Sequence, residues 1–194
     1  MTDFPDGTGY CDFVLKETAN PLHRIYHDQE YGFPQSEDNI LFERLTHEVF
    51  QAGLSWETIL KKRAAFALAF DGFDVKSVAN YGPEKVDALV QNQGIIRNRM
   101  KIDATIYNAN QILALTESSG SFKNWIDARH PQQMDDWIKL FKAQFKFMGK
   151  EVVGTFLQSL GYLPYAHHPQ CPTYSIIMAQ TPAWSLEKEF FAIE

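Results

Sequence analysis

The stretch HEVFQAGLSWETIL, at residues 47–60, joins two helical patterns through a tight turn. Apolar side chains recur at helical spacing through residues 38–52, which predicts a helix that ends inside this stretch. Gly53 suits the left-handed position that follows a helix, and Ser55 suits the N-cap of the next one. A second helix is therefore predicted over residues 56–68, and this pattern of helix, short turn and helix sets the fold class.

Glu48 lies on the apolar face of the first of these helices, because positions 41, 45, 48 and 52 share one face at 3.6 residues per turn. A buried carboxylate is costly unless it is paired, and its pKa should rise unless a partner holds the charge. Glu48 is therefore a candidate site residue, although a buried glutamate that bonds a loop amide would give the same pattern. Trp56 begins the next helix, and the two side chains would offer an acceptor and an aromatic wall to a flat heterocycle.

The rest of the chain shows helical periodicity and no alternating strand pattern of useful length. Further helices are predicted over residues 74–80, 83–92, 98–117, 121–128, 131–144 and 148–160. The terminal segments 1–37 and 161–194 contain most of the prolines and are expected to be loop-rich. We therefore expect an all-α fold in a single domain, residues 1–194, whose helical body spans residues 38–160.

Composition bounds the class of protein. A length of 194 residues suits one well-cored domain. No run approaches about 18 apolar residues, so no membrane span is expected. The start, MTDFPDGTGY, is acidic and lacks the basic and apolar regions of a signal peptide. Two cysteines at opposite ends do not suggest a disulfide scaffold, and we expect a cytoplasmic protein.

Cysteine and histidine residues near the two ends of the chain have the spacing of a metal site. Cys11 and His27 form one pair, and His167 and Cys171 form a second pair in the segment HHPQC. Two cysteines and two histidines would close a tetrahedral zinc site with no open position, so the ion would be structural and would pin the termini together. His168 could replace His167 as a ligand. A disulfide between Cys11 and Cys171, or two unrelated thiols, are alternative interpretations.

The segment LVQNQGIIRNRMKI, residues 89–102, indicates two helices joined by a tight turn at Gly94 and anchored by Ile95 and Ile96. Backbone N–H groups at the start of the second helix would face outward, where a phosphate can bind. Basic residues follow at positions 97, 99 and 101. The pattern favours a hairpin that holds a DNA backbone without reading bases. A plain helical corner with a solvated basic face is the alternative.

The charge distribution bears on the same question. The formal net charge is −6, which argues mildly against nucleic-acid binding. Basic residues are nevertheless gathered in three segments without any acid, residues 59–70, 92–102 and 137–150. Such segments can form a local phosphate-binding face on an acidic protein. Each segment, taken alone, could equally be solvated helix surface.

Together these motifs resemble the DNA-3-methyladenine glycosylase I family. The resemblance is carried, in order, by YHDQEYG at 26–32, EVFQAGLSW at 48–56, LKKR at 60–63, GIIRNRMKI at 94–102, FKFMG at 145–149, His167 and Cys171. It implies an all-helical helix-hairpin-helix DNA glycosylase fold with a zinc site that joins residues 1–37 to residues 161–172. It also implies excision of 3-methyladenine from double-stranded DNA that contains alkylated bases, in base excision repair. We place no counterpart for the tail, residues 173–194, in the family pattern.

The resemblance also implies roles for single residues. Zinc would bind Cys11, His27, His167 and Cys171, and the DNA backbone would be held by Gly94, Ile96, Arg97, Arg99 and Lys101. Glu48 would accept hydrogen bonds from the alkylated adenine, and Tyr26 and Trp56 would stack on it. N-alkylation already makes the base a good leaving group, so extrusion and positioning matter more than a strong acid. Whether Glu48 is catalytic or only recognises the base stays open.

We expect a monofunctional glycosylase that releases free 3-methyladenine and acts as a monomer. It would leave an abasic site without cutting the strand, since no lysine is proposed as a nucleophile. A catalytically weak or inactive DNA-binding or lesion-binding protein on the same scaffold is one alternative. A metal-dependent hydrolase is another, but four protein ligands would leave the zinc no position for a water molecule.

Overall fold

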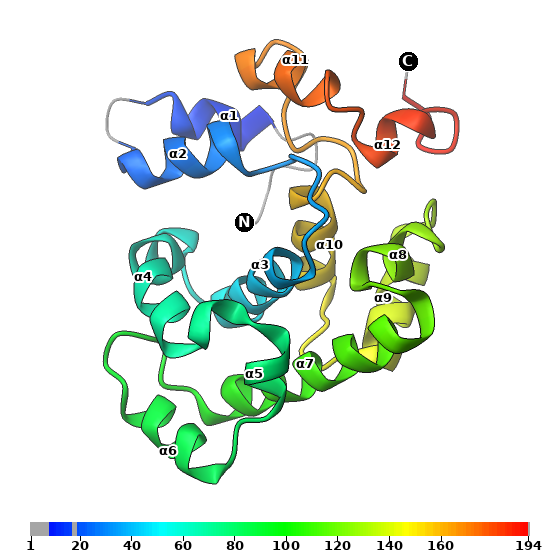
Figure 1. The fold of residues 1–194 in the computed structure, drawn as a ribbon. Coiled ribbons are helices and arrows are strands. Elements are labelled where there is room, and N and C mark those ends of the chain that lie inside the picture. Colours follow the sequence, from blue (N-terminus) through cyan, green and yellow to red (C-terminus); the bar gives the residue numbers. More distant parts are fainter. Residues whose placement is uncertain (1–7, 17–18, 194) are drawn as a thin grey trace. The chain divides into compact units, whose positions relative to one another are not determined.

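The structure is a computed structural model that describes residues 8–16 and 19–193, and all of its regular elements within these residues are helices (Figure 1). The all-α prediction is therefore confirmed. Most of the acidic start of the chain, residues 1–7, lies outside the described residues. The chain divides into two compact units. The terminal unit combines Met1–Gln35 with Gly154–Glu194, and the central unit is Ser36–Val153.

The central unit contains the helices that the apolar periodicity predicts. Their bounds are α3 Asp38–Gln51, α4 Trp56–Ala69, α5 Val75–Ala79, α6 Pro83–Gln91, α7 Arg99–Ser119, α8 Phe122–Asp127 and α9 Met134–Gln144, with a single 3-10 turn, η1, at Asp71–Phe73. α10, Lys150–Ser159, begins in this unit and continues into the terminal one. The long helix α7 contacts α3, α5, α6 and α8, so it is the central helix around which this unit packs.

An aromatic cluster fills the space between α3, α4 and η1. The ring of Phe66 lies 4.8 Å from that of Phe50 and 6.0 Å from that of Phe70, between ring centroids. Phe70 in turn stacks on Phe73 at 5.8 Å. All four side chains are buried, and aromatic pairs at these separations stabilise a core beyond the area that they bury. This cluster fixes how α3 and α4 diverge from the turn between them.

The α3–α4 turn, residues 52–55, has the chemistry predicted for it. Gly53 takes a φ of +85°, the left-handed conformation that a residue with a side chain rarely adopts. The hydroxyl of Ser55 accepts a hydrogen bond from the N–H of Thr58 at 3.3 Å, as an N-cap residue does. The turn therefore ends α3 just after Glu48 and begins α4 at Trp56.

The terminal unit differs from the prediction of loop-rich ends, because it contains four further helices. They are α1 Thr8–Val14, α2 Pro21–Gln29, α11 Pro172–Met178 and α12 Ala183–Leu186. Proline begins α2 and α11, where its missing N–H costs nothing, and Asn20 caps α2 by accepting from the N–H of Leu22 at 3.0 Å. Two of the prolines that suggested loops, Pro21 and Pro172, therefore mark helix starts.

The tail is part of the terminal unit. The N–H of Trp184 donates to the carbonyl of Gly161 at 3.1 Å, and the Trp184 side chain is buried. Gly161 has a φ of +75°, and a side chain there would also meet Pro182, whose Cβ would lie 2.9 Å from an added Cβ. Among the described residues, no helix is both long enough and apolar enough to cross a membrane.

Candidate functional site

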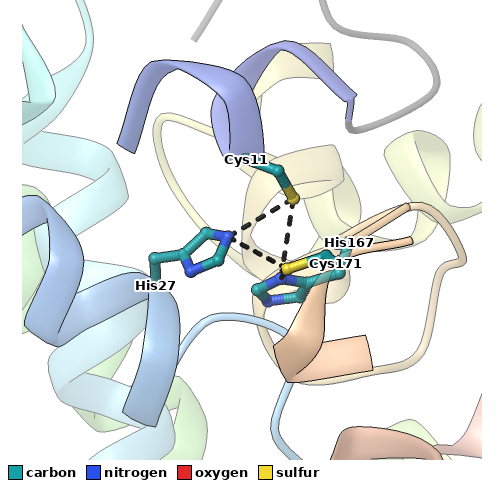
Figure 2. A group of neighbouring side chains, drawn as sticks. All are labelled: Cys11, His27, His167 and Cys171. Carbon is teal, nitrogen blue, oxygen red and sulfur yellow. Dashed lines mark hydrogen bonds between the residues drawn. The ribbon is translucent and has the colours of Figure 1, made fainter. Parts of the chain in front are cut away.

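The four residues predicted as metal ligands converge in the terminal unit (Figure 2). Cys11 comes from α1, His27 from α2, His167 from the loop after α10, and Cys171 from the residue before α11. All four are buried, and one ligand atom from each lies within 4.8 Å of the other three. The cluster could therefore hold a metal ion, and it joins segments from the two ends of the chain.

The separations between ligand atoms fit a tetrahedral ion. The Nε2 atom of His27 lies 3.3 Å from Cys11 Sγ and 3.7 Å from Cys171 Sγ. The Nδ1 atom of His167 lies 3.7 Å from Cys11 Sγ and 3.5 Å from Cys171 Sγ. A tetrahedral zinc ion at its usual bond lengths would hold neighbouring sulfur and nitrogen ligands about 3.6 Å apart. The sulfur–nitrogen separations in the cluster are therefore close to those of a tetrahedral zinc site.

Hydrogen bonds to the far nitrogen of each ring orient both histidines toward the cluster. Asp28 Oδ1 lies 2.7 Å from His27 Nδ1, and the carbonyl of Tyr31 lies 2.8 Å from His167 Nε2. An acceptor on the far nitrogen keeps the proton there and leaves a lone pair for the metal. Thr173 extends the network, since its hydroxyl donates to Asp28 at 3.3 Å.

Burial sets the protonation of the cluster. Desolvation lowers the pKa of His27 and lowers that of His167 to about 4, so both rings are neutral at pH 7 as metal ligands must be. Desolvation also raises the pKa of the Cys11 thiol to about 12. A buried thiolate pair would need a compensating cation, which a divalent metal supplies.

The structure places the residues on which the alternatives for this cluster depend. His168 lies outside the set of converging ligand atoms, and its ring is instead 3.1 Å from the side chain of Gln170. His167 is therefore the histidine that faces the cysteines. Cys11 and Cys171 are free thiols, so the disulfide alternative is not what this structure contains.

Glu48 is buried on α3 in the central unit, as its helical position predicts, with 2% of its surface exposed. Desolvation raises the pKa of its carboxyl to about 8, although the positive charge of Arg44 opposes part of that rise. No described residue donates a hydrogen bond to this carboxylate, so the alternative of a glutamate that bonds a loop amide finds no support among them. A buried carboxyl with a strongly raised pKa is typical of a functional site.

The two aromatic residues predicted to bind the base are also buried. Trp56 is the first residue of α4, and 6% of its surface is exposed. It is separated from Glu48 by the last turn of α3 and the α3–α4 turn. Tyr26 lies on α2 in the terminal unit, where its ring packs against that of Tyr31 at 5.7 Å.

The hairpin loop, residues 92–98, joins α6 to α7 as predicted, but Gly94 serves a different purpose. Its φ is not positive, so the turn does not need a left-handed residue there. A side chain at Gly94 would instead place a Cβ 3.1 Å from the Cβ of Ala65 on α4, which is closer than ordinary packing allows. Glycine at this position lets the hairpin loop lie directly against α4.

The hairpin loop has the free N–H groups that a phosphate requires. The N–H of Gly94 donates to Asn92 Oδ1 at 2.8 Å, and Ile95 is buried as an anchor. Within the described residues, the N–H groups of Ile96 and Arg97 have no hydrogen-bond acceptor. Arg97 also makes no ion pair with any of these residues, so its charge is available to an external anion.

Two of the predicted DNA contacts are placed differently from the expectation. Lys101, predicted to contact DNA, does not present its side chain at the surface, because it is buried and its ammonium donates to the carbonyls of Phe50 at 3.0 Å and Ala52 at 2.7 Å. Both carbonyls belong to the end of α3, where the last peptide groups of a helix lack internal partners. Arg99 remains exposed but pairs with Asp87 on α6.

The basic segment at 59–70 is also largely neutralised by neighbours that are distant in sequence or on the same helix. Lys61 pairs with Glu57, and Arg63 pairs with Glu43 on α3 at 3.0 Å. Lys62 donates to carbonyls of the hairpin loop. The charge pattern of this segment did not reveal this contact, because the acceptors are peptide groups about thirty residues away.

Comparison with known proteins agrees with the geometry. The model of the methyladenine glycosylase family matches residues 16–137. The chain is 34% identical to DNA-3-methyladenine glycosylase of Haemophilus influenzae over 184 residues, covering 85% of this chain and 97% of that protein. It is 37% identical to DNA-3-methyladenine glycosylase 1 of Escherichia coli K12 over 170 residues, covering 78% and 89%.

A solved structure gives the same result. The structure of 3-methyladenine DNA glycosylase I from Staphylococcus aureus, determined for its recognition of 3-methyladenine, superimposes with a TM-score of 0.75 at 28% identity. The match covers 85% of this chain and 97% of that one.

Proposed function

Because the chain belongs to the methyladenine glycosylase family, we propose that it is a DNA repair glycosylase that hydrolyses the N-glycosidic bond of 3-methyladenine in alkylated DNA. Water is the nucleophile, and the products are free 3-methyladenine and an abasic site. The observation that carries the proposal is Glu48, a buried carboxyl with a pKa of about 8 that lies one tight turn before a buried tryptophan.

The chemistry of the substrate suits these residues. An adenine methylated at a ring nitrogen is cationic, and aromatic faces attract cations. Trp56 supplies such a face, and Tyr26 is the second one on the strength of the sequence resemblance. Glu48 is buried, and its ionised form would offset the charge of a cationic base bound beside it. Since the alkylated base is already a good leaving group, recognition of its charge and shape accounts for much of the selectivity.

The proposed protonation change at Glu48 links recognition to catalysis. In the free protein, burial keeps the carboxyl protonated at pH 7 because its pKa is about 8. A cationic base beside it would favour the carboxylate, since an opposite charge at close range lowers the pKa of an acid. Glu48 would thus be protonated in the free protein and would release its proton when the lesion binds.

The metal cluster supports the fold and not the chemistry. We propose that it binds one zinc ion through Cys11, His27, His167 and Cys171. When bound, the ion neutralises the thiolates and links the ends of the chain. Four protein ligands fill a tetrahedral site and leave no position for a catalytic water, which disfavours a metal-dependent hydrolase.

DNA is held at the hairpin loop in this proposal. The N–H groups of Ile96 and Arg97, which have no acceptor among the described residues, and the guanidinium of Arg97 favour a phosphate, while Gly94 keeps the loop close to α4. Arg99 is a secondary contact because it must exchange its partner Asp87 for the phosphate. We propose a cytoplasmic monomer of one glycosylase domain that acts on double-stranded DNA.

Release of the free base tests the proposal. Duplex DNA alkylated with a methylating agent is incubated with pure, zinc-loaded protein, and the released bases are separated by chromatography. We expect 3-methyladenine to be released and the resulting abasic strand to remain uncut until it is treated with alkali. Binding to the alkylated duplex without any release would instead identify an inactive lesion-binding protein.

A further inference from the structure

Two lysines in the central unit each use their ammonium group to bind two backbone carbonyls of a turn. Lys62, on α4, donates to the carbonyls of Gln93 at 3.2 Å and Gly94 at 3.0 Å. These carbonyls belong to the hairpin loop. Charge-assisted hydrogen bonds of this kind are about twice as strong as those between neutral groups. Lys62 therefore ties the middle of α4 to the loop that carries the proposed DNA contacts.

Lys101 makes an equivalent contact from α7 to the end of α3. It lies in the first turn of α7, immediately after the hairpin loop, and donates to the carbonyls of Phe50 and Ala52. These carbonyls belong to the end of α3, at the α3–α4 turn. The Lys101 ammonium is desolvated, which lowers its pKa, and its compensation comes from these two peptide groups at the helix end.

The two contacts are reciprocal. A lysine that follows the α3–α4 turn binds the hairpin loop, and a lysine that follows the hairpin loop binds the end of α3. Gly94 lies close to α4 as well, since an added Cβ at this position would come within 3.1 Å of the Ala65 Cβ. Charged hydrogen bonds thus join α4 to the hairpin loop, and the first turn of α7 to the end of α3 and the α3–α4 turn.

We propose that Lys62 and Lys101 are positioning residues that hold the hairpin loop and the α3–α4 turn in one rigid element. The position of the DNA backbone and the placement of the base-binding residues would then depend on each other. Neither lysine needs to touch DNA for this role. The functional part of the inference rests on the proposed glycosylase activity, whereas the mechanical part concerns the protein alone.

Hydrogen exchange tests the mechanical part without DNA. The N–H of Leu54 bonds to Gln51 O at 2.7 Å, and the N–H of Gly94 bonds to Asn92 Oδ1 at 2.8 Å, so these amides report on the two turns. Lys62→Met keeps most of the side-chain volume and removes the charge. We expect it to speed exchange at Gly94 about tenfold or more, since a hydrogen bond from a charged group is lost. The decisive expectation is that exchange at Leu54 also speeds up.

Lys101→Met should speed amide exchange at Leu54 directly, and it should also speed exchange at Gly94 if the two segments are coupled. Lys62→Arg, which keeps the charge and the donors, should restore slow exchange at both amides. Lys61→Met is the matched control, because Lys61 lies beside Lys62 and pairs with Glu57 on its own helix. If Lys101→Met fails to fold, exchange at Leu54 in Lys62→Met is sufficient to test the coupling. An effect confined to Gly94 would overturn the coupling.

DNA binding separates positioning from direct contact. In Lys62→Met, base release should slow, while the slope of log affinity against log salt concentration stays at the wild-type value. A lysine that neutralised a phosphate would instead lower that slope by about 0.9 when removed. A fall of this size would overturn the positioning role. Failure of the wild-type protein to release any base would refute the proposed function but leave the exchange result intact.

Discussion

Replacing Glu48 by glutamine should change how the stability of the protein depends on pH. The pKa of the Glu48 carboxyl is about 8 in the folded protein and 4.5 in its ordinary state. Between these values the folded protein holds a proton that the unfolded chain has lost, so wild-type stability falls as the pH rises. Glutamine has no proton to lose, and its contribution stays constant. The stability of E48Q relative to wild type should therefore increase with pH.

The size of the effect follows from the two pKa values. The wild-type penalty is about 0.8 kcal/mol at pH 5 and about 3.4 kcal/mol at pH 7. The difference in unfolding free energy between E48Q and wild type should thus grow by about 2.5 kcal/mol across this interval. Urea denaturation of the DNA-free proteins at several pH values measures it. Glu84→Gln, at an exposed position in the first turn of α6, is the control. A difference that stays flat for E48Q would refute a protonated, desolvated Glu48.

Four further predictions concern the other groups. If the ionised Glu48 binds the base, the second-order rate of base release should rise with pH up to about 8 in wild type and lose this dependence in E48Q; an unchanged profile in E48Q contradicts the assignment. Arg97→Gln should lower the salt slope of DNA binding by about 0.9, and an unaltered slope would show that Arg97 is not a phosphate contact. Cys171→Ser should lose the bound zinc and lower the melting temperature, whereas His168→Ala should retain one zinc per chain. Metal analysis that finds the reverse would make His168 a zinc ligand and exclude Cys171. Asp28→Asn should weaken zinc binding about 10–100-fold in competition with a chelator, and equal affinity would remove Asp28 from the metal site.

The helices of the central unit were predictable from the sequence because their signals are local. Apolar spacing places Glu48 on the buried face, and Gly53 and Ser55 end and begin the flanking helices through their own backbone and side-chain chemistry. The terminal helices were missed because they are short and owe their stability to packing across the chain. Their starts were nevertheless marked by Asn20 and by prolines at the first helical position.

The convergence of two cysteines and two histidines was predictable for a different reason. Cysteine and histidine are rare in this chain, so their spacing is informative even across 140 residues or more. The sequence could not separate His167 from His168, which are chemically identical neighbours. Only the fold shows that the carbonyl of Tyr31 orients His167 toward the cysteines. The hydrogen bond from Thr173 to Asp28 was equally invisible, since nothing local marks a pair that is 145 residues apart.

The basic residues show where sequence reasoning fails. Lys101 and Arg97 belong to the same acid-free segment, and both were predicted to face DNA. In the structure, Lys101 is buried on two carbonyls of α3, whereas Arg97 has no partner among the described residues. Density of charge along the chain cannot distinguish them, because the groups that neutralise a lysine come from elements far away in sequence.

Single-turnover release of 3-methyladenine from methylated duplex DNA tests the central claim most directly, with wild-type protein and E48Q compared at saturating enzyme. We expect wild type to release the base and leave an abasic site, and E48Q to bind the same duplex but release the base more slowly. Equal rates for the two proteins would contradict the role of Glu48. No release by folded, zinc-loaded wild-type protein would contradict the proposed function itself.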